Sequence, residues 1–599
     1  MEPTNIKNPE YFHKVVDCQY ACPAHTPVPE YIRLIAAGKY TEAFMINWES
    51  NVFPGILGRT CDRPCEPACR RGRVGEEEEP VAICRLKRVA ADNKGEVKHL
   101  MPQGPFQSNG KKIALIGGGP ASLTVARDLA PLGYEIHLYD EWNKGGGMMR
   151  TQIPAFRLPI EVLEEEVDYV LDMGIHTHFN HYVDSMKEML EKDYDAIFVG
   201  TGAPKGRNLE LPGREEADAN IHIGIEWLAG VAFEHIESVG KKVIVLGGGN
   251  TAMDCCRTSK RIGGDSVTVV VRSPFKDMKA SPWEIEDAQR EDIPIFNNMP
   301  PKEFVVEDGK LKGVVFGKVR AEYEENGRRK LIPTGEPDVF IEADDVIIAI
   351  GQDNSFPWIE RDIGLELGKW DLPVLDKVTF QSTLPHVFFG GDSAFGPENV
   401  ITAVAHGHQA AISIHKFCQG EDINDRPPPN VNLTRQKMGI HEWMYDSYVV
   451  DDERYQVPHE EKALSLSDRM VEVELGFDND LGFKEAQRCL NCDVQTVFQE
   501  NLCIECDACM DVCPTSCITF TQNGTEDDLR ARLLAPANDL SQDLYVSDAL
   551  ATTRVMIKDE NVCLHCGLCA ERCPTAAWDM QKFFYSVTKA SEVCQLVTL

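Results

Sequence analysis

Short apolar runs alternate with helix-like stretches through the middle of the chain. Ile113–Ile116 and Ala196–Val199 are continuous apolar runs of strand length, and Asp344–Gly351 is a third buried strand that ends in glycine. Such runs are typical of parallel strands that are covered on both faces. Their alternation with helices such as Asn399–Phe417 predicts an α/β fold with Rossmann-like, three-layer domains.

A glycine-rich turn, Gly117-Gly-Gly119-Pro-Ala-Ser122, follows the first run, and the next strand, Glu135–Tyr139, ends at Asp140. In a dinucleotide-binding fold the glycines allow a tight turn beside the pyrophosphate, and the next helix offers its amides to the phosphates. Asp140 has the position of the acid that holds a ribose hydroxyl. A tight turn without a ligand is the alternative, but strand, glycines, helix, strand and acid in this order favour a dinucleotide site.

The same pattern recurs over Lys241–Arg272, where a strand leads into Gly247-Gly-Gly249-Asn-Thr-Ala252. Arg272 stands where NAD enzymes carry an acid, and an arginine there can pair with a 2′-phosphate. NADP(H) is therefore favoured over NAD(H); a surface arginine is the alternative reading. A further strand, His386–Asp392, ends in a carboxylate that can accept hydrogen bonds from ribityl hydroxyls or cap the following helix.

The C-terminal part carries two cysteine runs, Cys503-x-x-Cys506-x-x-Cys509-x-x-x-Cys513-Pro and Cys563-x-x-Cys566-x-x-Cys569-x-x-x-Cys573-Pro. In this bacterial ferredoxin spacing each fourth cysteine ligates the other cluster. One [4Fe–4S] cluster is expected on Cys503, Cys506, Cys509 and Cys573, and another on Cys563, Cys566, Cys569 and Cys513. We expect the stretch between the two halves, Thr521–Lys558, to be a surface insertion.

The N-terminal part holds six more cysteines beside prolines and short helices: Cys18, Cys22, Cys61, Cys65, Cys69 and Cys84. Thiolates next to chain-breaking prolines are typical of iron–sulfur ligands. Zinc is the alternative, but no His–Cys spacing of the finger type occurs.

Composition narrows the function classes. The 599 residues include 61 Lys+Arg and 95 Asp+Glu, a net charge of −34, which argues against nucleic acid and anionic membranes as partners. No apolar run approaches the ~20 residues of a membrane span, and Met1–Glu10 lacks signal-peptide character, so a cytoplasmic protein is expected. In that compartment the 21 cysteines favour metal ligation over disulfides.

With these motifs in view, Met1–Phe417 resembles the small (β) subunit of glutamate synthase. It also resembles the large subunit of NADH-dependent ferredoxin:NADP oxidoreductase and the N-terminal part of dihydropyrimidine dehydrogenase. The motifs that carry the resemblance are GRTCDRPCEPACRRG, PVAICRLKR, IGGGPAS, GGGMM with IPAFRLP, LGGGNTAMD, VVVRS and GGDSAFGPENVITAVAHGHQAA. The remainder resembles bacterial ferredoxins.

The resemblance implies six segments: an N-terminal helical iron–sulfur domain (1–108), a first FAD-binding part (109–208), an NAD(P)H-binding domain (209–340), a second FAD-binding part (341–418), an extended connector (419–485) and a ferredoxin-like domain (486–599). The FAD site would comprise Gly117, Gly119, Pro120, Ala121, Ser122, Asp140, Gly146, Gly147, Met148, Arg157, Thr201, Gly202, Gly391, Asp392, Ile401 and Ala403. The NAD(P) site would comprise Gly247, Gly248, Gly249, Asn250, Thr251, Ala252, Arg272 and Gly351.

The resemblance also implies two N-terminal [4Fe–4S] clusters, giving four in all, but the chain departs from the family pattern. Lys87 stands where the family has a Glu or Gln ligand, so Cys84 is expected to join Cys22, Cys61 and Cys65. The family's opening R-C-x-x-C is absent before Cys18 and recurs near the C-terminus as QRCLNCD. We therefore predict that Cys489 and Cys492 cross back to ligate a cluster with Cys18 and Cys69. In a third departure, Arg272-Ser273 replaces the two consecutive basic residues that are frequent in the family.

The implied function is that of an electron-transfer flavoenzyme subunit, which moves electrons between NAD(P)(H), FAD and iron–sulfur clusters and needs no catalytic side chain. No segment resembles a substrate-activating domain, so a catalytic partner is expected at the ferredoxin-like domain, such as a 2-oxoacid:ferredoxin oxidoreductase, a formate or aldehyde dehydrogenase, or a hydrogenase. Alternatives are the reductase subunit of glutamate synthase and a non-catalytic wiring subunit. A disulfide reductase is disfavoured, because Cys255 and Cys256 are adjacent and no C-x-x-C occurs between Cys84 and Cys489.

Overall fold

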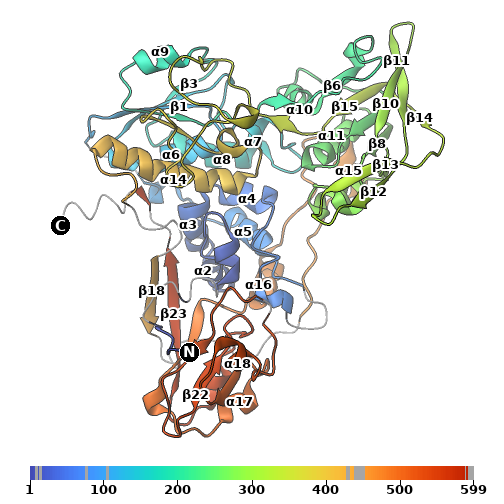
Figure 1. The fold of residues 1–599 in the computed structure, drawn as a ribbon. Coiled ribbons are helices and arrows are strands. Elements are labelled where there is room, and N and C mark those ends of the chain that lie inside the picture. The colour runs from blue at the N-terminus through green and yellow to red at the C-terminus, as the bar shows by residue number, and fades with distance from the viewer. Residues whose placement is uncertain are drawn as a thin grey trace. The chain divides into compact units, whose positions relative to one another are not determined.

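The computed structural model describes residues 1–6, 11, 16–73, 79–102, 107–425, 432–437, 452–537, 539–586 and 589–590. The chain forms two compact units, coloured by position in the sequence in Figure 1. Unit 1 comprises Met1–Leu100, Asp425–Val457 and Gly476–Leu599, and unit 2 comprises Met101–Asn424 and Pro458–Leu475. Each unit thus joins segments that lie far apart in the sequence.

The first sheet of unit 2 is the expected dinucleotide-binding sheet. Its five strands are all parallel, in the order β17-β4-β1-β2-β3. The strands are β1 (Lys112–Ile116), β2 (Glu135–Tyr139), β3 (His176–His178), β4 (Ala196–Val199) and β17 (Val387–Phe389). The accompanying helices are α6 (Pro120–Leu129), α7 (Met148–Thr151), α8 (Ile160–Leu171), α9 (Met186–Glu191), α13 (Asp392–Phe395) and α14 (Val400–Gln419). Helix α14 packs along α6, directly behind the first glycine turn.

The second sheet of unit 2 has the order β6-β15-β7-β8-β9, again all parallel. Its strands are β6 (Ile221–Ile223), β7 (Lys242–Leu246), β8 (Ser266–Val270), β9 (Ile295–Phe296) and β15 (Asp345–Ile348). Its helices are α10 (Gly224–Ala232), α11 (Asn250–Arg261) and α12 (Pro282–Arg290). The α/β class with two Rossmann-like domains is confirmed.

One boundary expected from the sequence is wrong. Asp344–Gly351 was expected to resume the flavin domain, but β15 lies between β6 and β7 inside the second sheet. The short pair of β5 (Lys205–Gly206) and β16 (Gln352–Asp353) lies at the two crossings between the domains, so the flavin domain resumes after Asp353. The intervening strands form antiparallel ribbons: β10 (Pro301–Glu307), β11 (Lys310–Phe316) and β14 (Val339–Glu342), and β12 (Val319–Tyr323) with β13 (Arg329–Pro333).

Part of the expected connector belongs to unit 2. Helix α15 (Lys462–Ser467) lies in this stretch, and the Lys462 ammonium binds Asp292. Further along, Val473 N–H donates to the Phe156 carbonyl at 2.9 Å. The stretch is therefore folded against the core of unit 2. Three consecutive prolines of the connector, Pro427–Pro429, lie outside the described residues.

The N-terminal helices of unit 1 are α1 (Asp17–Ala21), α2 (Val28–Ala36), α3 (Tyr40–Asn51), α4 (Pro54–Thr60) and α5 (Ile83–Asp92). Helix α16 (Asn479–Gln487), which was expected to be extended connector, packs against α2 and α5. A buried carboxylate on α16, Glu485, accepts from Ala82 N–H at 2.8 Å, just before α5 begins. The C-terminal segment therefore enters the N-terminal helical domain before it reaches the ferredoxin-like part.

The ferredoxin-like part of unit 1 contains two small antiparallel sheets, β18-β23-β19 and β20-β22-β21. Its strands are β18 (Asn432–Lys437), β19 (Val494–Phe498), β20 (Ile518–Thr521), β21 (Tyr545–Val546), β22 (Val555–Lys558) and β23 (Trp578–Ser586). Its helices are α17 (Ala508–Val512), α18 (Glu526–Arg530) and α19 (Leu568–Arg572).

Only part of the stretch Thr521–Lys558 is the surface insertion that was expected: of the described residues between 522 and 541, Leu529 alone is buried. Strand β22 pairs with β20, and Met556 and Ile557 have no exposed surface. The second half of the stretch therefore joins the core of this part, through buried residues between Leu544 and Ile557. No helix in the described part of the chain is both long and apolar enough to cross a membrane.

Candidate redox sites

The first two glycines of the first turn leave no room for side chains. Gly117 has φ +94°, and a Cβ there would lie 2.6 Å from the Gly200 carbonyl oxygen. A Cβ on Gly118 would lie 2.8 Å from a carboxylate oxygen of Asp140. Ser122 is fully buried against Gly200, so the small third residue serves the close helix–strand approach that glycine usually allows.

Loops from four strand ends meet at this turn. Gly146 N–H donates to the Gly118 carbonyl at 2.8 Å, and Gly147 lies against Gly119. The Met148 methyl group lies beside Gly202, while Gly391 lies between Ala121 and Ala403. Ile401 is buried in the first turn of α14. Fifteen of the sixteen residues that the resemblance assigns to FAD thus lie at the carboxyl ends of the strands of the first sheet, where open α/β sheets bind their ligands.

Polar groups at these strand ends fit a bound dinucleotide. Asp140 accepts the N–H groups of Gly118 (2.5 Å) and Trp142 (2.8 Å), as expected for an acid that fixes the turn and faces a ribose. Burial raises the pKa of Asp392 to about 6, with partial compensation from the Glu398 N–H. Thr201 Oγ1 is buried and lacks a hydrogen-bond partner within the described protein, which suits contact with a cofactor.

Arg157 is the exception among the residues assigned to FAD. Its guanidinium binds both oxygens of Asp254 (2.6 and 2.8 Å) and Glu284 (2.5 Å). These carboxylates raise the Arg157 pKa despite burial, so the charge is committed to α11 and α12 of the second domain. The contacts make Arg157 a link between the two nucleotide-binding domains, and do not support its assignment to FAD.

The second glycine turn has the same close packing. Gly247 has φ +147°, and a Cβ there would collide with the Ala349 carbonyl. Asn250 Oδ1 accepts from Ser281 N–H at 2.8 Å, and the Gly248 carbonyl accepts from Lys279 and Ala280 N–H groups at 2.9 Å each. Thr251 and the fully buried Ala252 continue into α11, which begins at Asn250. A Cβ on Gly249 would meet nothing within 4 Å, so space remains above the helix N-terminus.

Arg272 and Gly351 stand at the margins of this second turn. Arg272 follows the end of β8 and its side chain is exposed to solvent, as a 2′-phosphate ligand requires. Gly351 has φ +120°, and its carbonyl accepts from Arg207 N–H at 3.0 Å at the crossing between the domains.

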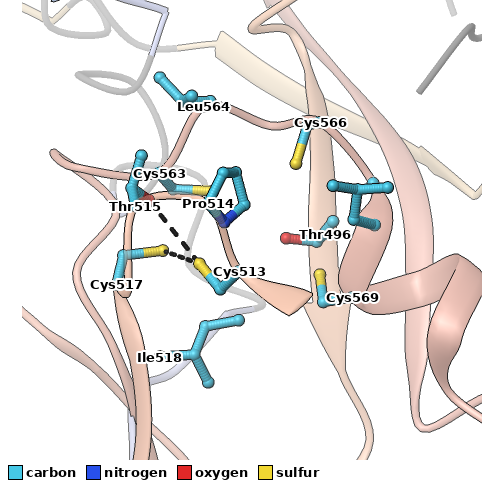
Figure 2. A pocket seen from close by; sticks show the side chains of 12 residues that line it. Thr496, Cys513, Pro514, Thr515, Cys517, Ile518, Cys563, Leu564, Cys566 and Cys569 are labelled. Carbon is cyan, nitrogen blue, oxygen red and sulfur yellow. Dashed lines mark hydrogen bonds between the residues drawn. The ribbon is translucent and has the colours of Figure 1, made fainter. Parts of the chain in front are cut away.

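The C-terminal cysteines gather into the two sets that the spacing indicated. Figure 2 shows the thiols of Cys513, Cys563, Cys566 and Cys569 around one small cavity beside Thr496. In the other set, Cys503, Cys506, Cys509 and Cys573 lie close enough for their charges to interact. The first residues of α17 and α19 follow αL residues, which lets each helix begin within the ligand run.

Four N-terminal cysteines form a third set. The thiols of Cys61 and Cys65 donate to Cys84, and these contacts lower the Cys84 pKa well below its usual value. Cys22 lies near enough to influence the same buried cation, Lys87. Burial alone would lower the Lys87 pKa, but the charges of the surrounding thiolates raise it. Lys87 Nζ donates to Asn51 Oδ1 at 2.7 Å, which suits an ammonium beside the set and not an iron ligand.

The fourth set joins the two ends of the chain. Cys18, Cys69, Cys489 and Cys492 line one small cavity, walled by residues of α1, α2 and the segment after α16. Cys489 and Cys492 were expected here on the resemblance, although about 400 residues separate them from Cys69. Arg33 fixes this segment by donating to both carboxylate oxygens of Asp493, at 2.7 and 2.6 Å.

Sequence reasoning missed Arg70, which lies between the fourth set and the ferredoxin-like part. Its Nε donates to Asp17 at 2.8 Å, and its Nη1 donates to the carbonyls of Glu560 and Cys563, the latter at 2.8 Å. The side chain is only 2% exposed. Arg70 belongs to the motif GRTCDRPCEPACRRG, but the motif does not reveal this role, because Glu560 and Cys563 lie almost 500 positions away in the sequence.

Sixteen cysteines thus form four sets of four, the number of protein ligands that a [4Fe–4S] cluster takes. The remaining described cysteines differ in character. Cys255 and Cys256 are fully buried on α11, and Cys517 lies 3.5 Å from Cys513, sulfur to sulfur. Cys594 lies outside the described residues.

Comparisons with known proteins agree with this arrangement. A pyridine nucleotide-disulphide oxidoreductase model matches residues 111–407, a dihydropyrimidine dehydrogenase domain II 4Fe–4S cluster model matches residues 12–99, and a 4Fe–4S dicluster domain model matches residues 502–577.

Three relatives illustrate the matches along the chain. The beta subunit of NADP(+)-dependent formate dehydrogenase from Moorella thermoacetica is 33% identical, over 79% of this chain and 70% of the relative. The beta subunit of NADPH-Fe(3+) oxidoreductase from Geobacter sulfurreducens is 30% identical, over 82% and 77%. The glutamate synthase [NADPH] small chain of Escherichia coli is 32% identical, over 67% of this chain and 88% of its own.

Glycine turns, cysteine sets and these relatives together assign FAD, NADP and [4Fe–4S] clusters to the chain. The chain is an oxidoreductase and belongs to the family of the glutamate synthase small chain and the beta subunits of NADP(+)-dependent formate dehydrogenase and NADPH-Fe(3+) oxidoreductase.

Proposed function

We propose that the chain is the NADPH-dependent electron-transfer subunit of a larger enzyme and connects a nicotinamide site to a partner subunit through four [4Fe–4S] clusters. The observation that carries the proposal is the presence of four cysteine sets in unit 1. Together with the two glycine turns of unit 2, they offer a binding site for each electron carrier. When bound, FAD supplies the exchange between hydride and single-electron chemistry, and the clusters supply one-electron carriers.

The protein's own task is to hold and orient these groups. At the first turn, the N–H groups of α6 and the Asp140 and Asp392 carboxylates would hold the dinucleotide. At the second turn, α11 would hold the nicotinamide nucleotide, with Arg272 placed for its 2′-phosphate. In unit 1 the ligand sets would be Cys22/Cys61/Cys65/Cys84, Cys18/Cys69/Cys489/Cys492, Cys513/Cys563/Cys566/Cys569 and Cys503/Cys506/Cys509/Cys573.

The ferredoxin-like part is the proposed docking site of the partner. Cys506 is exposed, and Ile504, in the same ligand run, is 62% exposed. An apolar side chain beside solvent-accessible cluster ligands suits a contact through which single electrons pass to another protein. Of the expected partners, a formate dehydrogenase catalytic subunit is favoured, because the Moorella relative bears that name and matches 79% of this chain.

The test compares a one-electron protein acceptor with a two-electron quinone, both driven by NADPH. In the Cys503→Ser/Cys506→Ser variant, reduction of a bacterial ferredoxin should fall at least tenfold, whereas menadione reduction should keep its rate. Cys418→Ser, which lies in no ligand set, is the matched control. Equal loss with both acceptors would contradict an exit through the ferredoxin-like part.

Glutamate synthase remains the second candidate, since the small chain from Escherichia coli is a relative. Copurification identifies the partner directly. Glutamine-dependent NADPH oxidation by the native complex would favour this alternative over the proposed formate-linked function.

A further inference from the structure

The edge of the first sheet of unit 2 carries an unusual group of side chains. Strands β2 and β3 run parallel, with His137 opposite His176 and Tyr139 opposite His178. Because side chains alternate between faces along a strand, Glu135 and His137 share a face with His176 and His178. A Glu-x-His pair and a His-x-His pair therefore lie side by side on the edge strand and its neighbour.

The distances bring these side chains within reach of one ion. Glu135 Oε1 lies 2.8 Å from His137 Nε2, and the ligand atoms of Glu135, His137 and His176 all lie within 4.8 Å of one another. The rings of His137 and His176 are stacked, with centroids 4.9 Å apart. His176 is exposed and the Glu135 side chain is 39% exposed, so an ion can enter from solvent.

A third histidine fixes the orientation of the central one. His178 Nε2 lies 3.0 Å from His137 Nδ1, so in the tautomer that donates through Nδ1 the Nε2 lone pair faces Glu135 and can bind an ion held between the two side chains. The His178 ring in turn stacks on Tyr139, with centroids 4.4 Å apart. Metal-binding histidines usually have such a partner on the second ring nitrogen.

We propose that Glu135, His137 and His176 bind one Zn²⁺ ion, with His178 orienting His137. Imidazole and carboxylate suit zinc, and three protein ligands leave one tetrahedral position for water. The ordinary reading, a histidine–glutamate hydrogen bond at a sheet edge, accounts for Glu135 and His137 but gives no reason for His176 to share their face. Lys112 Nζ, 3.9 Å from Glu135 Oε1, is the cation that an ion would displace.

The site would clamp the short edge strand next to the proposed flavin site. Strand β3 has only three residues, and the His178 carbonyl accepts from Asp140 N–H at 3.1 Å. The next contact follows at once, since His181 N–H donates to the Asp140 carbonyl at 2.9 Å. An ion that holds β3 on β2 would thus stabilise the backbone on both sides of Asp140. The proposal does not depend on the electron-transfer function.

The experiment uses the full chain with its iron–sulfur clusters in place. Equilibrium dialysis against Zn²⁺ is followed by measurement of zinc and iron in the same sample, so that zinc exchanged into cysteine sets is recognised by lost iron. One zinc per chain is expected at unchanged iron, and none in His176→Ala. His178→Ala should weaken binding by about tenfold or more, the usual effect of losing an orienting partner.

Two further variants keep the proposal falsifiable if a histidine variant folds poorly. Lys112→Gln removes the competing ammonium from a half-exposed position and should tighten zinc binding. His99→Ala, an exposed histidine in unit 1, is the matched control and should bind like the parent. Equal zinc retention by the parent and His176→Ala, or no retained zinc in the parent, would overturn the proposal.

Discussion

The double substitution Cys489→Ser/Cys492→Ser tests the cysteine set that joins the two ends of the chain. These two thiols line a cavity with Cys18 and Cys69, from opposite ends of the sequence. Serine oxygens are poor iron ligands beside thiolates, and the two remaining cysteines cannot hold a [4Fe–4S] cluster that takes four. Only this one of the four sets contains the replaced residues.

The magnitude follows from the ligand sets. The parent should contain about sixteen irons in four clusters, and the variant about twelve. The surrounding segment should remain folded, because the Arg33–Asp493 pair (2.6 Å) and the buried Arg488–Glu485 pair (2.8 Å) do not involve the thiols. Iron loss would therefore report the missing ligands and not an unfolded segment.

The assay combines iron analysis with EPR of the dithionite-reduced protein. Signals of the ferredoxin type should remain. The Cys418→Ser variant keeps all four ligand sets and should therefore keep the full iron content. Unchanged iron in the double variant would refute the crossing and leave Cys18 and Cys69 without a cluster. A loss of about eight irons would show that neighbouring sets depend on this one.

Three further predictions concern unit 2. Arg272→Ala should lower kcat/KM for NADPH by about tenfold or more with little change for NADH, since it removes a charged hydrogen bond to the 2′-phosphate; equal effects on both nucleotides would contradict the assignment. Burial raises the pKa of Asp392 to about 6, and the ionised carboxylate accepts hydrogen bonds from hydroxyl groups. The affinity of the deflavinated protein for FAD should therefore rise between about pH 5 and 7, and Asp392→Asn should abolish that rise in a fluorescence titration. Arg257→Met should lower the free energy of unfolding by about 1.5–3 kcal/mol, because buried Glu291 loses its 2.9 Å ion pair with Arg257 but keeps its pair with Arg261, whereas the exposed Arg290→Met should cost at most about 1 kcal/mol; similar thermal shifts would refute this.

Local motifs allowed much of the fold to be predicted. Gly117 and Gly247 need conformations and close backbone contacts that only glycine allows, so their spacing marks both nucleotide turns. The ferredoxin runs are equally informative, because ligands held by one cluster must recur at fixed intervals. Both features are set by residues close to one another in the sequence, so the sequence alone reveals them.

Among features that depend on distant partners, the meeting of Cys489 and Cys492 with Cys18 and Cys69 was expected from the resemblance, but others were missed. The apolar run at Asp345–Ile348 fits either parallel sheet, and only its pairing with β7 places it in the second one. Arg157 belongs to a family motif, but its partner Glu284 stands 127 positions away. The histidines of β2 and β3 were overlooked because alternation reveals a shared face only after the register of the two strands is known.

The central claim, that the chain carries electrons from NADPH to its iron–sulfur clusters, is tested most directly by anaerobic mixing of the reconstituted chain with NADPH. Flavin absorbance is followed while rapidly frozen samples are taken for EPR. We predict that flavin bleaching is followed by signals of reduced clusters, including those of the C-terminal dicluster that the Cys503→Ser/Cys506→Ser variant loses. Complete flavin bleaching with clusters that stay oxidised, although dithionite reduces them, would contradict the account.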